Sequence, residues 1–459
     1  MIELPGLWSA LLPVWLPLAA LPLVYFFRRQ AFIAALLAST VLGVIAWWLV
    51  VNPATNIDIL GRELLLSGIA QVLLVALAIW LIIAFLFAWR ISQGWTLFPV
   101  LLLVYSLITA ALLFEELVVQ VLLLKIAWLV MILLVQGGTK GTTRAATRLL
   151  ILAVLAVPPF LLAATLITQR VFQPESAETL TSIIVLALGI GFALMLAIIP
   201  FHAWFPQVVE DGPPLVAAWL VAGMGGSYLI ILFDLLGRYQ WLAENEQVQR
   251  ILFRGGLLLA IGGALLIVTE RHLGRLWSYA VLADLGYILL GFSFASRPGM
   301  LAALLLIISR LVNLLLAGAA LATIRHHATS LYFDQIAGVG PRVPLSIFAF
   351  AIGGLAMLGA PLTAGFPGHW AVLRLMVQTD SGWAVALVST SLLGSIGFLR
   401  AFAVMANRVD EDKLTKIKPE PRIATFMLSA LAGLSILIGL APQTMNPVLA
   451  YLLRSLNFF

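Results

Sequence analysis

Ionisable side chains inside long apolar runs are the residues of this 459-residue chain that are best suited to chemistry. A charge at mid-depth of a bilayer costs about 2.5–3.5 kcal/mol on insertion scales, so such groups should face a polar interior and pair with one another. They predict a proton or ion relay, although a static buried pair satisfies the same physics. The candidates for the path are Glu116, Lys125, His202, Asp284, Arg310 and His369.

Glu116 and Lys125 occupy the same expected helix but cannot pair within it. At about 100° and 1.5 Å per residue, Lys125 falls on the opposite face and about 13 Å farther along the axis. Each side chain therefore needs a partner on a neighbouring helix. Glu116 also follows Glu115 at the junction of two expected helices, so a pair of boundary carboxylates is an open alternative.

Several other chemistries are excluded by residue type. The chain has no cysteine, which removes disulfides, thiolate-held iron–sulfur clusters and thiol catalysis. Its five histidines show neither metal-ligand nor haem spacing, so we expect no metal and no cofactor. Residues 137–143 (GGTKGTT) lack the order of a phosphate-binding loop, and no strand precedes them. Any redox chemistry is therefore expected outside this chain.

The elements that must position these groups are membrane helices. Hydrophobic residues make up 63% of the chain and charged residues 10%, which excludes a soluble globule and most nucleic-acid binders. We expect an all-α integral membrane protein with about fourteen crossings, since runs of about 17–25 apolar residues follow one another almost end to end. The runs are 7–27, 30–51, 64–89, 94–114, 117–136, 149–169, 179–203, 213–236, 251–269, 276–296, 299–324, 343–377, 382–405 and 423–445.

Basic residues in the loops predict the orientation. The net charge is +6, and 16 of the 26 Lys and Arg residues follow odd-numbered helices, whereas seven follow even-numbered helices or lie in the tail. The positive-inside rule then places the odd loops in the cytoplasm and both termini on the non-cytoplasmic side. The closely following helices also argue against a cleaved signal peptide.

Helices seven and twelve are interrupted by proline and glycine in a matched way, at 200–206 (PFHAWFP) and 359–370 (GAPLTAGFPGHW). Unwound backbone at this depth is tolerated only where it lines a protein-buried or hydrated cavity. The breaks are five helices apart, an odd offset, so two inverted five-helix repeats are predicted, with a kink of purely structural purpose as the alternative. The expected division is a three-helix segment at 1–92, a first half at 93–238, a second half at 249–408, and a loop with the last helix at 409–459.

Three stretches resemble the antiporter-like membrane subunits shared by respiratory complex I, photosynthetic NDH, membrane-bound hydrogenases and Mrp-type cation/proton antiporters. They are 200–214, which begins with PFHAWFP and ends with EDGPP; 275–287 (RLWSYAVLADLGY); and 334–340 (DQIAGVG) together with the break before His369. Within the family, the chain is most similar to the branch that includes complex I chain N. Chain M and the Mrp D-type subunit are alternatives.

The resemblance implies a proton path, and the chain departs from it at several positions. The family's helix-five glutamate is matched by Glu116, and His369 occupies the helix-twelve position. Met195 and Met224 stand where the lysines of helices seven and eight belong, so the first half-channel lacks two of the family's titratable groups. Asp284 falls where many members have histidine, and Asp284, Arg310 and His369 could form a relay in the second half.

The resemblance therefore implies a membrane subunit of a complex I-like NADH/quinone oxidoreductase or a related antiporter-like assembly. This subunit would contribute to proton or cation translocation, with electron transfer on partner subunits and no redox centre of its own. A degenerate, non-conducting structural subunit and an Mrp-type antiporter subunit are the alternatives. The expected partners are other membrane-arm subunits and the lipid bilayer of an inner or cytoplasmic membrane, with no nucleic acid.

Overall fold

The chain folds almost entirely into apolar helices. The computed structural model describes residues 11–52, 56–59, 62–136, 143–172, 177–328, 330–407 and 419–455. The glycine-rich segment 137–142 and most of the charged loop, at 408–418, lie outside these described residues. Within them, eleven helices are long and apolar enough to cross a membrane, and three shorter apolar helices accompany them. The predicted helical, multi-pass membrane fold is confirmed.

The chain packs into two compact units, of which the first comprises Met1–Ala197, Leu220–Val248 and Ala450–Phe458. Its helices satisfy their backbone groups internally, as a lipid environment requires. The described elements are α2 (Leu12–Phe26), α3 (Ala31–Val51), β1 (Asn56–Ile59), β2 (Arg62–Leu65), α4 (Gly68–Ala88), α5 (Leu97–Leu113), α6 (Leu117–Gln136), α7 (Thr143–Leu155), α8 (Val157–Phe172), α9 (Ala177–Met195), η3 (Leu220–Gly225), α12 (Gly226–Arg238) and α13 (Gln240–Ala243). The two strands pair antiparallel as a short hairpin.

The second unit comprises Ile198–Trp219 and Gln249–Leu449, with Phe459. Its described elements are η2 (Phe201–Ala203), α10 (Trp204–Asp211), α11 (Pro214–Trp219), α14 (Glu246–Thr269), α15 (Leu273–Ser293), α16 (Arg297–His327), α17 (Phe333–Ile336), α18 (Pro344–Ala356), α19 (Phe366–Thr379), α20 (Ser381–Ala406), α22 (Arg422–Leu440) and η4 (Pro442–Met445). Helix α14 begins in the first unit, and the last helix, α23 (Asn446–Ser455), also contributes residues to both.

Helix α15 of the second unit is long and apolar enough to cross a membrane, and it is completely buried. Small residues let it pack backbone to backbone against α14. A Cβ on Gly256 of α14 would lie 2.8 Å from the carbonyl oxygen of Gly286 on α15, so only glycine permits this approach. The close packing fixes α15, the helix that carries Asp284.

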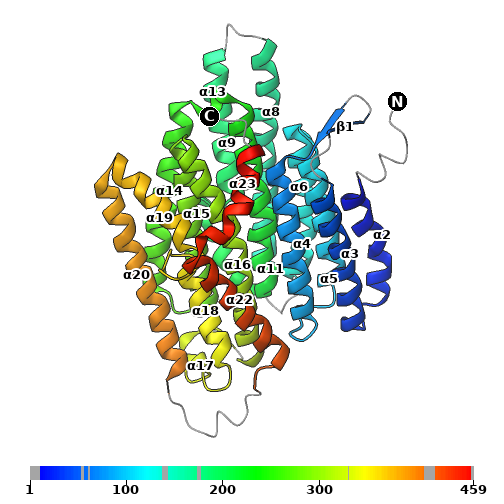
Figure 1. Cartoon of the computed structure of the whole chain (residues 1–459), viewed down its shortest axis with the longest axis vertical. Helices are drawn as coiled ribbons and strands as arrows, with labels where there is room; N and C mark the ends of the chain where they lie inside the picture. Colours follow the sequence, from blue (N-terminus) through cyan, green and yellow to red (C-terminus); the bar gives the residue numbers. More distant parts are fainter. Residues whose placement is uncertain are drawn as a thin grey trace. The chain divides into compact units, whose positions relative to one another are not determined.

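Helices α16, α18 and α22 lie side by side in the same unit (Figure 1).

Polar side chains define where several of the unit's helices begin, because they accept hydrogen bonds from the first free backbone N–H groups. Ser296 caps α16 in this way through Gly299, and Asp380 caps α20 through Gly382.

Candidate functional site

An ion pair lies inside the second unit, between α15 and α16. Arg310 Nη1 donates to Asp284 Oδ2 at 2.8 Å, and both side chains are almost completely buried. The guanidinium cannot lose its proton in a protein, so Arg310 is a fixed positive charge beside the carboxylate. The hydrogen bond is charge-assisted and therefore among the stronger ones a protein makes.

His369 faces the second oxygen of the same carboxylate. Its Nε2 lies 3.8 Å from Asp284 Oδ1, and its Nδ1 lies 2.9 Å from the carbonyl oxygen of Gly365. A carbonyl only accepts, so Nδ1 carries the hydrogen, and Nε2 is the nitrogen that can gain or lose a proton. Nε2 is buried and has no hydrogen-bond partner among the described residues.

The histidine is presented by a break between α18 and α19. Helix α18 ends at Ala356 and α19 begins at Phe366. Two residues between them, Gly359 (φ 71°) and Leu362 (φ 68°), have left-handed backbone. A Cβ on Gly359 would lie 2.6 Å from the imidazole of His369, so the tight turn and the ring occupy the same small space.

Aromatic and hydroxyl groups complete this site. The ring of Tyr287 packs against that of His369 with centroids 4.3 Å apart, and the Tyr287 hydroxyl lies 3.0 Å from Ser391 Oγ. Asp284, Arg310 and His369 come from three helices, and the structure brings all three together.

Lys125 belongs to the first unit and has a different environment. Its Nζ lies 2.7 Å from Met195 Sδ, with the rings of Tyr228 and Phe160 at 5.4 Å and 5.7 Å. No carboxylate of the described residues lies within ion-pair distance of it. The ammonium group of Lys125 on α6 thus contacts the side chain of Met195, the last residue of α9.

The other predicted site residues lie apart from these two groups. Glu116 is exposed, directly before α6. Met224 is fully buried in a π-helical turn, η3. His202 is half-buried in η2, and its Nδ1 has no hydrogen-bond partner among the described residues.

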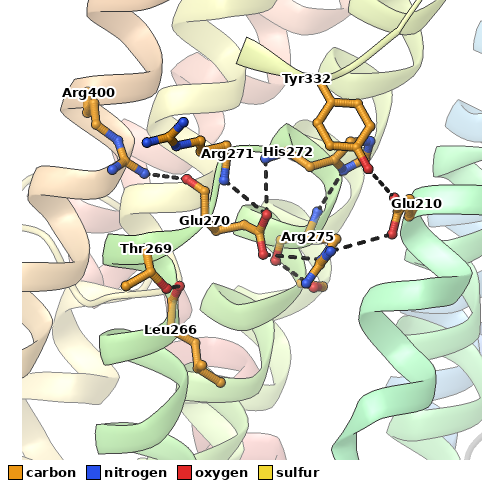
Figure 2. Close-up of polar contacts among 10 residues, drawn as sticks. Glu210, Leu266, Thr269, Glu270, Arg271, His272, Arg275, Tyr332 and Arg400 are labelled. Carbon is orange, nitrogen blue, oxygen red and sulfur yellow. Dashed lines mark hydrogen bonds and ion pairs between the residues drawn. The ribbon is translucent and has the colours of Figure 1, made fainter. Parts of the chain in front are cut away.

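A polar network at the helix ends of the second unit was not predicted from the sequence (Figure 2). Arg275 Nε lies 3.2 Å from Glu270 Oε2, and Arg275 Nη1 lies 3.9 Å from Glu210 Oε2. The Tyr332 hydroxyl donates to Glu210 Oε1 at 2.8 Å, and Arg400 donates to the Glu270 carbonyl. Two of the quoted motifs contain Glu210 and Arg275, and this was the only signal for the network.

Two groups of this network have shifted acidities. His272 caps α15, since its Nδ1 accepts from the backbone N–H of Arg275 at 3.3 Å. Burial lowers the pKa of His272 to about 4, and the cap requires an unprotonated Nδ1. The hydrogen bond to Glu210 raises the pKa of Tyr332. The described residues contain no cluster of three or more His, Cys, Asp or Glu suited to a metal ion.

Solved structures share this fold over nearly the full chain. A chain of the archaeal membrane-bound sulfane sulfur reductase superimposes with a TM-score of 0.83 at 15% identity, covering 98% of this chain and 97% of that one. A chain of the Mrp complex from Dietzia sp. gives 0.83 at 16% identity with the same coverage. A chain of Thermus thermophilus respiratory complex I gives 0.76 at 20% identity, covering 96% and 99%.

Curated relatives match over a shorter stretch. NADH-quinone oxidoreductase subunit N 3 of Streptomyces griseus is 26% identical over 283 residues, which is 59% of this chain and 50% of the relative. Subunit N of Parafrankia sp. is 27% identical over 267 residues, or 56% and 49%. The matches span about half the length of these relatives. The sequence profile described as NADH:quinone oxidoreductase/Mrp antiporter, transmembrane, matches residues 105–395, and the chain therefore belongs to that family.

Proposed function

We propose that this chain moves protons across an energy-converting membrane as one subunit of a complex I-like or related antiporter-like assembly. Electron transfer, where the assembly has it, takes place on partner subunits. The single observation that carries the proposal is the buried group of Asp284, Arg310 and His369 beside the α18–α19 break. The names of the relatives support the setting, since they are subunits of NADH-quinone oxidoreductases and of multi-subunit membrane complexes.

The geometry supplies one step of proton transfer. His369 takes a proton at Nε2, because Nδ1 is held by the backbone carbonyl of Gly365. A closure of about 1 Å brings the imidazolium within hydrogen-bond distance of Asp284 Oδ1. Asp284 then lies between two cations, the mobile charge of His369 and the fixed charge of Arg310. When the ring moves back from the carboxylate, the imidazolium loses this stabilisation and Nε2 gives its proton to a water molecule.

Lys125 is the ionisable group that we assign to the first half of the path, with His202 and Glu116 as access residues nearer the helix ends. The environment of Lys125 also favours the second candidate function, a subunit in which the first half no longer conducts. No described carboxylate pairs with it, and Met195 and Met224 carry no proton. In that case only the second half moves protons.

The two helix breaks support the proposed inverted repeats at 93–238 and 249–408. A non-glycine residue with left-handed backbone accompanies each break: Ala197 (φ 56°) lies just before 200–206, and Leu362 (φ 68°) lies within 359–370. By the distribution of basic residues, we place the odd-numbered loops, and with them the network of Figure 2, on the cytoplasmic side. Both termini then lie on the other side of an inner or cytoplasmic membrane.

Proton uptake by vesicles that contain the whole assembly tests the proposal. We expect Asp284→Asn and His369→Asn to abolish most proton movement, because the Asn side chain does not titrate in this pH range. Asn has nearly the shape of Asp and is smaller than His. Asp380→Asn is the matched control, since this exposed residue caps α20 and Asn also caps well. His326→Asn, at an exposed position of α16, controls for the histidine.

The outcomes separate the candidate functions. Proton movement at the wild-type rate in both site variants would show a structural subunit and refute the proposal. Movement that depends on added Na⁺ in the wild type would indicate cation/proton exchange. Loss of movement in the site variants only, with both controls active, supports conduction through the second half.

A further inference from the structure

Helix α22 lies outside the proposed second repeat, yet it contacts the break that presents His369. Ser435 on α22 is fully buried, and its Oγ accepts from the backbone N–H of Ala364 at 3.3 Å. The same hydroxyl donates to Asn313 Oδ1 on α16 at 2.9 Å. One serine therefore joins the break to α16.

The direction of both hydrogen bonds is fixed by chemistry. The backbone N–H of Ala364 can only donate, and the hydroxyl gives its single hydrogen to the Asn313 carbonyl oxygen. Ala364 lies in the unwound segment before Phe366, where its N–H has no intrahelical acceptor. Inside a membrane protein an unpaired N–H is costly, so the Ser435 hydroxyl satisfies a group that the break itself exposes.

A second contact shows that α22 packs directly on the unwound backbone. A Cβ on Gly439, one helical turn after Ser435, would lie 2.5 Å from the carbonyl carbon of Leu362 and from the nitrogen of Thr363. Ala364 also packs with Ile438 in a small apolar cluster. Helix α22 thus supports the break through both polar and apolar contacts.

The supported segment is the one that orients His369. The next residue after Ala364 is Gly365, whose carbonyl oxygen holds Nδ1 of His369. Asn313 lies one helical turn after Arg310 on α16, and Arg310 holds Asp284. Hydrogen bonds through Ser435 therefore connect the break to Asn313 of α16. This connection lies one helical turn from Arg310, the member of the ion pair on the same helix.

We infer that Ser435 and Asn313 are positioning residues for proton transfer at His369. They hold Ala364 and Gly365 so that Nε2 of His369 points at Asp284. The inference rests on the proposed function and extends the site to α22, a helix beyond the two proposed repeats. The titratable or charged groups that face His369 are Asp284 and Tyr287 from α15 and Arg310 from α16.

The test compares Ser435→Ala with Ser435→Thr in the whole assembly reconstituted in vesicles. Loss of the hydroxyl leaves a buried N–H unpaired, and we expect proton movement to fall roughly tenfold with a shifted pH profile. Ser435→Thr keeps the hydroxyl and should restore both the rate and the profile. Ser429→Ala is the matched control, because Ser429 is an exposed serine of α22 whose hydroxyl donates to the Thr425 carbonyl of its own helix.

Asn313→Leu provides a second variant if Ser435→Ala does not assemble. It removes the acceptor of the Ser435 hydroxyl but leaves the bond from Ala364, so we expect a smaller fall in rate with the same shift of profile. A wild-type rate and profile in Ser435→Ala, or in Asn313→Leu if the first does not assemble, would overturn the inference. If His369→Asn is inactive in that same experiment, the proposed function stands and only the positioning role fails.

Discussion

Replacing Asp284 by Asn removes one charge of the buried pair and leaves Arg310 without its counter-ion. The side chains of both residues are at most 5% exposed, so water cannot compensate. Removing one partner of such a pair costs about 3–5 kcal/mol of stability, because the remaining charge stays buried. Replacing both partners by uncharged side chains of similar size often leaves the stability unchanged or increases it.

We therefore expect Asp284→Asn to lower the free energy of unfolding by about 3–5 kcal/mol. The double variant Asp284→Asn with Arg310→Met should return to within about 1 kcal/mol of the wild type. Unfolding in mixed micelles, followed by circular dichroism, measures both values. Proton movement in vesicles is then measured on the same preparations.

The two readouts separate a static pair from a conducting one. A pair with only a structural role predicts that the double variant recovers stability and proton movement together. A conducting pair predicts recovered stability without recovered movement, because the carboxylate that faces His369 is still absent. Full proton movement in the stable double variant would refute the reasoning.

Three further perturbations follow from the structure. The free energy of unfolding in detergent should fall by up to about 3 kcal/mol as the pH drops from about 6.5 to 4. Burial lowers the pKa of His272 to about 4 in the folded protein, so over this pH range His272 binds a proton more readily in the unfolded chain. His272→Asn, which keeps a capping oxygen, should remove that dependence, and an unchanged pH curve would contradict it. Gly359→Ala should destabilise the protein by at least about 1 kcal/mol and slow proton movement, since φ is 71° and the new methyl meets His369, whereas Gly43→Ala in α3, with open space around it, should do neither. Lys125→Met should raise the free energy of unfolding and lower the rate of proton movement, and an unaltered rate would exclude Lys125 from the path.

The sequence was enough to single out the ionisable residues of the second half as candidates. It was not enough to predict that their side chains contact one another. Asp284, Arg310 and His369 are conspicuous in the sequence because each interrupts an apolar run. Helix α15 is buried on all sides, so no amphipathic pattern shows which way Asp284 points. Its pairing with Arg310 depends on the rotation and packing of whole helices, which only the fold provides.

The helix breaks were predictable because their causes are local. Proline and glycine are concentrated at 359–370, where proline removes an amide donor and clashes with the preceding turn. The support from Ser435 was not predictable, since a serine in an apolar helix usually bonds its own backbone. The contact of Lys125 with Met195 was not predictable either, because the two residues are 70 positions apart and neither segment has a local pattern that indicates it.

The number of protons moved for each electron transferred, in an assembly that contains this chain, tests the central claim most directly. With His369→Asn, electron transfer on the partner subunits should continue while this ratio falls below the wild-type value. His326→Asn should leave the ratio unchanged. An unaltered ratio in His369→Asn, with electron transfer intact, would show that no proton passes through the site at Asp284 and His369.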